Sequence, residues 1–335
     1  MSRAQFIEWL TCIFYIQVDD LSSIPTVKVY APERVFCSRY TTCVQNSTDE
    51  IKPKLPILTL FTTWNSTSSK IKLHNNTVRN WSSMKPFIIP VIFSDSEHVR
   101  TTCLSAGWEA LPVSVSVHGV PVLKYMYRDV KERFNSTFYA YSNGDILYTD
   151  SLIDTLLELV MLGVNLRKPL LIVGRRTNVL NVTTEEASSW EAIDNTANAR
   201  GNLFSSDAED YFITSDSFPW EAVDELIIGR PAYDNWLVLF SRGCGFRTID
   251  VTRTVLAVHQ TDFKGNSEGH GHSHRDYNKR LLIAAHGSVD FNAGRTDCLI
   301  LYTRNTTQVF EVILKPESNV PYYCNQQRYK HETCN

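Results

Sequence analysis

A carboxylate at a predicted helix start is the first group in this sequence that could carry out chemistry. Asp234 follows the turn Gly229-Arg230-Pro231 and precedes the apolar run 237–240. Proline suits the first turn of a helix, and a helix N-terminus favours negative charge. The pattern therefore predicts a helix that begins near Pro231 and holds Asp234 at a rigid, partly exposed place that would suit a catalytic base. The alternative is a capped surface helix with Trp236 in the core.

A second candidate group follows an apolar run that has the length of a buried strand. Asn143-Gly144-Asp145 comes directly after 138–141, so an amide and a carboxylate share one tight turn. Oxygen ligands of this kind suit Mg²⁺ or Mn²⁺. His259 ends the apolar run 255–258 and is a further candidate ligand, since imidazole completes a manganese shell. The alternatives are an ordinary Asn-Gly turn and a hydrogen-bonded histidine at a strand end.

Basic side chains gather at two further places. Arg175 and Arg176 follow the apolar run 170–173 and suit phosphate or carboxylate recognition. A surface salt-bridge pair is the alternative interpretation. The segment 265–274 is rich in glycine and histidine, which predicts a mobile, solvated loop. A flexible lid over a crevice is the other interpretation of this segment.

Alternating strands and helices must position these groups. Strands are predicted at 57–63, 87–93, 111–117, 137–141 and 169–173, and helices at 69–83, 97–106, 121–134 and 151–162. This alternation predicts an α/β fold with a mostly parallel, doubly wound sheet. Ligands bind such sheets at the carboxyl ends of the strands. The polar residues at these ends should therefore line one crevice: Thr62, Thr63, Asp95, Asn143 and Asp145.

Composition bounds the classes of function. The chain has 335 residues, which is long enough for one large domain or two smaller ones. Hydrophobic residues make up 43% of it, and the net charge is −3. The charge excludes the electrostatic footprint of a nucleic-acid-binding protein, and no polybasic run suggests a membrane surface. Residues 1–53 read as an N-terminal extension. Its apolar stretch 10–18 is too short to cross a bilayer, which leaves a weak signal core or a truncated anchor open.

Two features indicate the secretory pathway. Seven Asn-x-Ser/Thr sequons begin at Asn46, Asn65, Asn75, Asn80, Asn135, Asn181 and Asn305. The eight cysteines contain no C-x-x-C pair, which argues against a zinc site and is compatible with disulfides. Cys37/Cys43 and Cys324/Cys334 are candidate local disulfides, although the pairing cannot be deduced from sequence. Buried thiols are the alternative.

Taken in order, these blocks resemble glycosyltransferases of the GT-A type, in the nucleotide-diphospho-sugar transferase superfamily, and most of all a family-2-like group. The matching blocks are 58–63, 91–95, 141–146, 173–176, 210–212, 228–237 and 249–260. The resemblance spans about residues 55 to 263 and weakens through about 302. It implies a Rossmann-type, mostly parallel central sheet with flanking helices. It divides the chain into an extension (1–53), a GT-A-like domain (54–302) and a C-terminal tail (303–335) with a possible disulfide.

The resemblance also implies roles for individual residues. Asn143 and Asp145 occupy the family's Asp-x-Asp position, which holds Mn²⁺ or Mg²⁺ against the donor diphosphate, and asparagine replaces the first aspartate here. His259 matches a late histidine that contacts metal or diphosphate. Asp234 lies where inverting members keep the acceptor-side base. The remaining implied contacts are with the nucleotide sugar (Thr62, Thr63, Asp95, Asn143 and Arg175) and with the acceptor (Asn235 and Trp236).

Three hypotheses follow for the function. The first is a metal-dependent glycosyltransferase of the Golgi or endoplasmic reticulum lumen, or a secreted one, that moves a sugar from a nucleotide-diphosphate donor to a hydroxyl of a glycan or glycoconjugate. The second is a non-catalytic relative that keeps the fold as a glycan- or protein-binding module. The third is a disulfide-stapled interaction protein with no nucleotide site. The third predicts that Asp145, Asp234 and His259 do not converge.

Overall fold

A mixed central sheet organises the chain. The computed structural model describes residues 55–64, 68–262, 271–306 and 309–325. Within these residues, nine strands form one sheet in the order β15-β14-β12-β8-β11-β6-β1-β2-β3. The strands are β1 (Leu58–Thr63), β2 (Ile88–Phe93), β3 (Glu109–Leu111), β6 (Phe138–Ser142), β8 (Leu170–Val173), β11 (Tyr211–Ser215), β12 (Arg247–Asp250), β14 (Leu301–Asn305) and β15 (Phe310–Leu314).

Most neighbours in this sheet are parallel, and two strands run the other way. β11 is antiparallel to both β6 and β8, and β15 is antiparallel to β14 at the edge. The other neighbouring pairs are parallel. The predicted α/β class with a mostly parallel central sheet is therefore confirmed. The reversal of β11 brings its first residue to the edge where β6 and β8 end.

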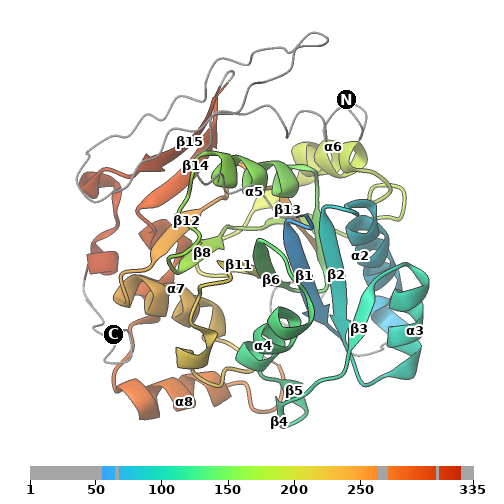
Figure 1. Ribbon diagram of the computed structural model, residues 1–335, viewed down its shortest axis with the longest axis horizontal. Coiled ribbons are helices and arrows are strands. Elements are labelled where there is room, and N and C mark those ends of the chain that lie inside the picture. The colour runs from blue at the N-terminus through green and yellow to red at the C-terminus, as the bar shows by residue number, and fades with distance from the viewer. Residues whose placement is uncertain (1–54, 65–67, 263–270, 307–308, 326–335) are drawn as a thin grey trace, which may run out of the picture.

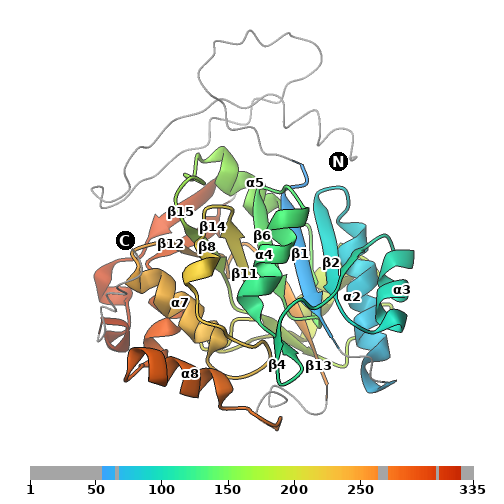
Figure 2. The ribbon, with the colours of Figure 1, turned by 60° about the horizontal axis from the view of Figure 1, so that its bottom comes forward.

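Helices cover both faces of the sheet (Figures 1 and 2). In β8, Leu170 and Ile172 belong to one core cluster and Leu171 and Val173 to the other, because successive side chains of a strand point to opposite faces. The first cluster includes residues of α2 (Ile71–Ser83), α3 (Glu97–Ser105) and α5 (Ser151–Met161). The second includes residues of α4 (Leu123–Arg133), α7 (Tyr233–Gly243) and α8 (Tyr277–His286).

A smaller sheet and a hairpin complete the fold. The four-stranded sheet has the order β10-β9-β13-β7, and its strands are β7 (Ile146–Tyr148), β9 (Thr177–Leu180), β10 (Asn202–Leu203) and β13 (Ala257–Thr261). α6 (Trp190–Arg200) packs against this sheet through Ile193 and Ala197. The hairpin pairs β4 (Ser116–Val117) with β5 (Val120–Pro121). The smaller sheet matters for the site because β7 begins directly after Asp145 and β13 contains His259.

Several predicted elements occur as expected, and some bounds need correction. The helix predicted at 121–134 is α4, and it buries the predicted face of Leu123, Met126, Tyr127 and Val130. The strand predicted at 111–117 is instead β3 and β4, with a break between them. The helix predicted from Pro231 begins at Tyr233, because Ala232 before it is left-handed, with φ of 82°. His259 does not end its strand, since β13 continues to Thr261.

The C-terminal segment is part of the same sheet. The boundary predicted between 302 and 303 falls inside β14, which pairs with β12 on one side and β15 on the other. The predicted Cys324/Cys334 disulfide is wrong, because Cys324 pairs with Cys298. Cys244 is also disulfide-bonded, and Cys103 is a buried free thiol. The extension 1–53, with Cys37 and Cys43, lies outside the described residues.

No helix in the described part of the chain combines the length and the apolarity that crossing a bilayer requires.

Candidate active site

The carboxyl ends of the parallel strands bring polar residues from distant segments together. Asn143 follows the last residue of β6, and Asp210 precedes the first residue of the antiparallel β11. Because Tyr211 pairs with Ser142, these two neighbours meet at the same edge. Arg176 reaches the same place from the turn after β8. The sheet thus assembles a charged cluster from three strand ends, as expected for a ligand site in an α/β fold.

Asn143 forms hydrogen bonds through its backbone N–H, its side-chain amide and its side-chain oxygen. Its backbone N–H donates to the Asp210 carbonyl at 2.8 Å, and its side-chain amide donates to Asp210 Oδ1 at 2.7 Å. Its side-chain oxygen accepts from the hydroxyls of Tyr141 at 3.0 Å and Tyr233 at 3.4 Å. An asparagine can donate to Asp210 where an aspartate would repel it. The amide of Asn143 is thus compatible with its neighbour Asp210 at the position where the resemblance expects a carboxylate.

Arg176, rather than Arg175, faces this cluster. The Arg176 guanidinium pairs with Asp210 Oδ2, and both side chains are buried, at 7% and 6% exposure. Arg175 instead donates from its guanidinium to the carbonyl of Phe204. Nε and one terminal nitrogen of Arg175 are thus engaged by the backbone, and its contact with the nucleotide sugar stays a prediction.

Asp145 and His259 form a second pair beside the first. β13 and β7 align His259 with Ile146, which places its ring next to the preceding residue, Asp145. His259 Nε2 lies 3.3 Å from Asp145 Oδ2, and His259 Nδ1 lies 2.9 Å from the Thr261 hydroxyl. The other carboxylate oxygen, Asp145 Oδ1, is buried with no hydrogen-bond partner among the described residues. Buried polar atoms are nearly always paired, so this oxygen is a candidate ligand atom.

The charges of the two pairs act on each other. Burial raises the pKa of Asp145, but His259, Lys70 and Arg176 outweigh this and hold it at about 2. Burial lowers the pKa of His259, and Asp145 followed by Asp210 raises it above its usual value. Each shift therefore has its source in the residues gathered at this edge. The third hypothesis expected no convergence here, and the structure shows that Asp145 and His259 do converge.

Asp234 joins the cluster from the first turn of α7. Burial raises the pKa of its carboxyl to about 7, with smaller contributions from Asp210 and Asp207. Its Oδ1 accepts the backbone N–H of Asn235 at 2.9 Å. The pKa of the neighbouring Glu209 is also raised, first by burial and then by Asp234. A carboxyl with a pKa near neutrality is suited to taking up a proton at physiological pH.

Asn235 and Trp236, which follow Asp234, are the residues predicted to contact the acceptor. Trp236 is completely buried, and its ring lies 4.6 Å from that of His286. The expectation that it stacks on an acceptor is wrong, and the alternative of a core tryptophan holds. Asn235 is half-buried, and its amide donates to the Asp207 carbonyl at 3.3 Å and to Glu209 Oε2 at 3.4 Å. Its role toward an acceptor stays a prediction.

The predicted nucleoside contacts differ in exposure. Thr62 is completely buried, so its side chain is not available to a nucleoside as predicted. Thr63 is half-buried and Asp95 is exposed, with Asp95 Oδ1 accepting the Val113 N–H at 3.2 Å. Trp64 lies against Gly144, where an added Cβ would be 2.6 Å from the ring. The contacts of Thr63 and Asp95 with a nucleoside stay predictions.

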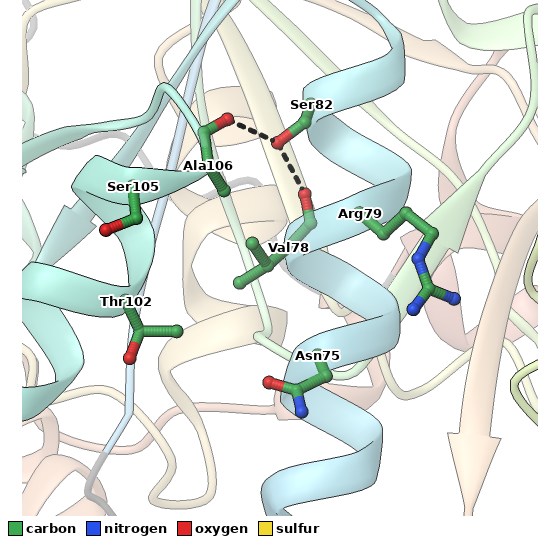
Figure 3. A pocket seen from close by; sticks show the side chains of 7 residues that line it. All are labelled: Asn75, Val78, Arg79, Ser82, Thr102, Ser105 and Ala106. Carbon is green, nitrogen blue, oxygen red and sulfur yellow. Dashed lines mark hydrogen bonds between the residues drawn. The ribbon is translucent and has the colours of Figure 1, made fainter.

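Two open surface hollows among the described residues lie away from this cluster. One of about 490 Å³ lies between α2 and α3, lined by Asn75, Val78, Arg79, Ser82, Thr102, Ser105 and Ala106 (Figure 3). A second, of about 470 Å³, involves the opposite end of β11, around Asp216 and Trp220. Neither contains a predicted site residue. The cluster around Asp210 is thus identified by its convergent polar groups and not by a cavity.

Sequence reasoning missed three residues of this cluster. Asp210 and Tyr233 lie in the blocks 210–212 and 228–237 that carry the resemblance, but neither they nor Glu209 was assigned a role, because their partners are far away in the chain. The available hint was an acidic pair directly before the apolar run 211–213. Only the antiparallel direction of β11 makes the start of that strand a neighbour of Asn143.

Comparisons with known proteins give distant likenesses. No family model matches the chain, and no curated protein matches its sequence. Among solved structures, glucosyl-3-phosphoglycerate synthase from Mycobacterium tuberculosis, with Mg²⁺ and uridine diphosphate, is similar over 77% of this chain and 87% of that one (9% identity, TM-score 0.39). The inositol-1-phosphate CTP transferase from T. maritima is similar over 70% and 99% (13% identity, TM-score 0.33).

A third likeness is to residues 1–349 of TarS from S. aureus, with 7% identity and a TM-score of 0.26. The match covers 36% of this chain and spans 36% of that one. At such TM-scores these likenesses carry no argument about activity. The case for a function rests on the geometry of the site.

Proposed function

We propose that this chain is a transferase that moves a sugar from a nucleoside-diphosphate donor to a hydroxyl acceptor. The observation that carries the proposal is the convergence of the buried ion pair Asp210–Arg176 with the half-buried pair Asp145–His259. The carboxyl of Asp234 lies close enough to Asp210 for the charge of Asp210 to raise its pKa. A group transfer to a hydroxyl needs residues that hold the donor and a separate base that takes the hydroxyl proton. The carboxyl ends of the strands, where ligands bind in such sheets, bring both together here.

Asp145 and His259 fit a divalent cation. The unpartnered, buried Asp145 Oδ1 supports this assignment. A carboxylate suits Mn²⁺ or Mg²⁺, and a neutral imidazole could complete the shell of Mn²⁺. The Asn143 oxygen is less available, because two tyrosine hydroxyls already donate to it. A bound cation would supply charge neutralisation for a departing diphosphate.

On the acceptor side, Asp234 is proposed as the base. Because its pKa is raised to about 7, a substantial fraction of Asp234 is ionised near neutral pH and can accept the hydroxyl proton. The N-terminus of α7 fixes the backbone of this residue. The negative charges of Asp210 and Asp207 oppose a further negative charge nearby, and this adds to the effect of burial in keeping the pKa of Asp234 high.

A location in the secretory pathway is part of the proposal. The Cys298–Cys324 disulfide supports an oxidising compartment, since such bonds are rare in the cytosol. Exposed sequon asparagines at Asn75 and Asn181 support the same location. The membrane association and the acceptor stay open to experiment.

A second candidate function is a non-catalytic module that binds a nucleotide sugar or a glycan. It is favoured by the engagement of Asn143, whose side-chain atoms are all used by Tyr141, Tyr233 and Asp210. Binding without turnover is the property that distinguishes this function from the first.

The test uses the full chain with a panel of nucleoside-diphosphate sugars and Mn²⁺. Binding is followed by calorimetry and turnover by release of nucleoside diphosphate. We expect Asp145→Ala to abolish binding that depends on Mn²⁺, and Asp234→Asn to preserve binding while lowering turnover by about 10²–10⁴-fold. Asp216→Asn is the matched control, because Asp216 is an exposed carboxylate beyond the other end of β11.

Each outcome decides between the candidates. Binding with turnover supports the transferase. Binding of a donor by the wild-type chain without any turnover favours the binding module. If no donor binds and Asp145→Ala changes nothing, both candidates fail.

A further inference from the structure

A short 3-10 turn, Thr296–Cys298, is hydrogen-bonded to the segment that carries Asp210. The Thr296 backbone N–H donates to the Ser206 carbonyl at 2.8 Å, and the Thr296 hydroxyl donates to Glu209 Oε1 at 2.6 Å. The Ser206 hydroxyl donates to Asp297 Oδ2 at 2.9 Å. Thr296 is completely buried and Glu209 is 1% exposed, so water cannot replace their bond.

This turn is itself fastened by a disulfide. Cys298 directly follows Asp297 and pairs with Cys324. Tyr323, next to Cys324, donates its hydroxyl to Asp297 Oδ2 at 2.7 Å. The Cys324 carbonyl accepts from Arg242 of α7 at 2.9 Å. We call the residues Thr296, Asp297, Cys298, Tyr323 and Cys324 the C-terminal brace.

The segment held by the brace has no regular structure of its own. Residues 204–210 form neither helix nor strand. Their last residue, Asp210, makes the hydrogen bond to Asn143 and the ion pair with Arg176. A segment without a backbone ladder depends on such side-chain bonds for its local stability. The placement of Asp210 therefore depends on contacts from a part of the chain about 90 residues later.

We propose that the C-terminal brace positions the segment 204–210, and through it Asp210, at the candidate site. Thr296 and Asp297 are positioning residues, and the Cys298–Cys324 disulfide keeps them in place. The expected effect of the brace on nucleotide binding rests on the proposed function, whereas the positioning of residues 204–210 does not. Loss of the brace loosens one edge of the site and leaves the central sheet folded.

The test is hydrogen–deuterium exchange of the full chain. Thr296→Val removes the hydroxyl and keeps the shape, and Thr296→Ser restores the hydroxyl. Ser206→Ala and the double substitution Cys298→Ser with Cys324→Ser break the other two links. Arg304→Gln is the matched control, because it breaks an exposed ion pair with Glu311 in the same C-terminal region without touching the brace.

We expect the amides of 204–210 to exchange about tenfold faster in Thr296→Val and in the double variant, with a smaller effect in Ser206→Ala. Exchange in β6, β8 and β11 should stay unchanged. Thr296→Ser and Arg304→Gln should match the wild type. Calorimetry with uridine diphosphate and Mn²⁺ supplies a second readout, and its dissociation constant should rise in Thr296→Val and recover in Thr296→Ser.

Unchanged exchange at 204–210 in both Thr296→Val and Ser206→Ala overturns the proposal. Faster exchange throughout the sheet in both also overturns it, because the brace would then be a general stabiliser. If wild-type protein binds no uridine diphosphate while exchange behaves as expected, the positioning stands and the proposed function is weakened instead.

Discussion

The guanidinium of Arg176 pairs with the carboxylate of Asp210 where the end of β8 meets the start of β11, and both side chains are buried. The second oxygen of Asp210 accepts the side-chain amide of Asn143. One carboxylate thus links three segments that are distant in the chain. The charge of Asp210 also contributes to the raised pKa values of His259 and Asp234.

Removing one partner of this ion pair should be costly. Arg176→Met leaves the Asp210 carboxylate buried without its cation, and we expect a loss of about 3–5 kcal/mol in the free energy of unfolding. Urea unfolding followed by circular dichroism measures this loss. Arg304→Gln breaks an exposed pair and should change little by comparison. Equal losses in the two variants would contradict the assigned burial of the Arg176–Asp210 pair.

Introducing an aspartate at position 143 should destabilise the fold. Asn143→Asp replaces a donor to Asp210 Oδ1, now at 2.7 Å, by a second carboxylate. Two adjacent carboxylates raise the pKa of one of them, so protonation at low pH relieves the repulsion. We expect the loss in unfolding free energy to be larger at pH 8 than at pH 5. A variant as stable as the wild type at pH 8 would show that the amide of Asn143 is not needed there.

The raised pKa of Asp234 should appear in the pH dependence of stability. Its pKa in the folded chain, about 7, lies above the ordinary aspartate value of 3.8, so the folded chain binds more protons than the unfolded chain between these two pH values. Stability from this group is therefore present at low pH and is lost as the pH rises toward 7. Urea unfolding between pH 5 and 8 should show a downward slope that becomes flatter in Asp234→Asn. An identical slope in the variant would assign the titration to another group.

The same carboxyl should control turnover if the proposed function holds. A base must be unprotonated, so the transfer rate should fall as the pH decreases through about 7. The measurement is the pH profile of nucleoside-diphosphate release. A rate that does not change between pH 6 and 8 would exclude Asp234 as the base.

Burial separates the sequons into usable and unusable sites. Asn75 and Asn181 are exposed, whereas Asn80 is 3% exposed and exchanges two hydrogen bonds of 2.8 Å with the backbone of Tyr148. When the chain is expressed through a secretory pathway, we expect glycans at Asn75 and Asn181 and none at Asn80. Mass spectrometry of glycopeptides measures the occupancy, with Asn75→Gln and Asn181→Gln as controls. A folded chain with a glycan on Asn80 would contradict the structure.

The sequence by itself determined the elements whose signal is local. The periodic face of α4 and the apolar runs of β1, β2, β6 and β8 follow from side-chain spacing within one segment, and all of them occur. The turn after β6 and the position of Asp234 in the first turn of α7 were predictable for the same reason. Local periodicity also allowed Trp236 to be either in the core or on the surface, and could not choose between them.

Only the tertiary structure decided which of these groups meet. The antiparallel direction of β11 brings Asp210 to Asn143, and the register of β13 on β7 brings His259 to Asp145. The choice of Arg176 over Arg175, and of Cys298 as the partner of Cys324, likewise depends on contacts between distant segments. Such contacts follow from strand order and register, which are set by the packing of the whole sheet, and no single segment of sequence carries that information.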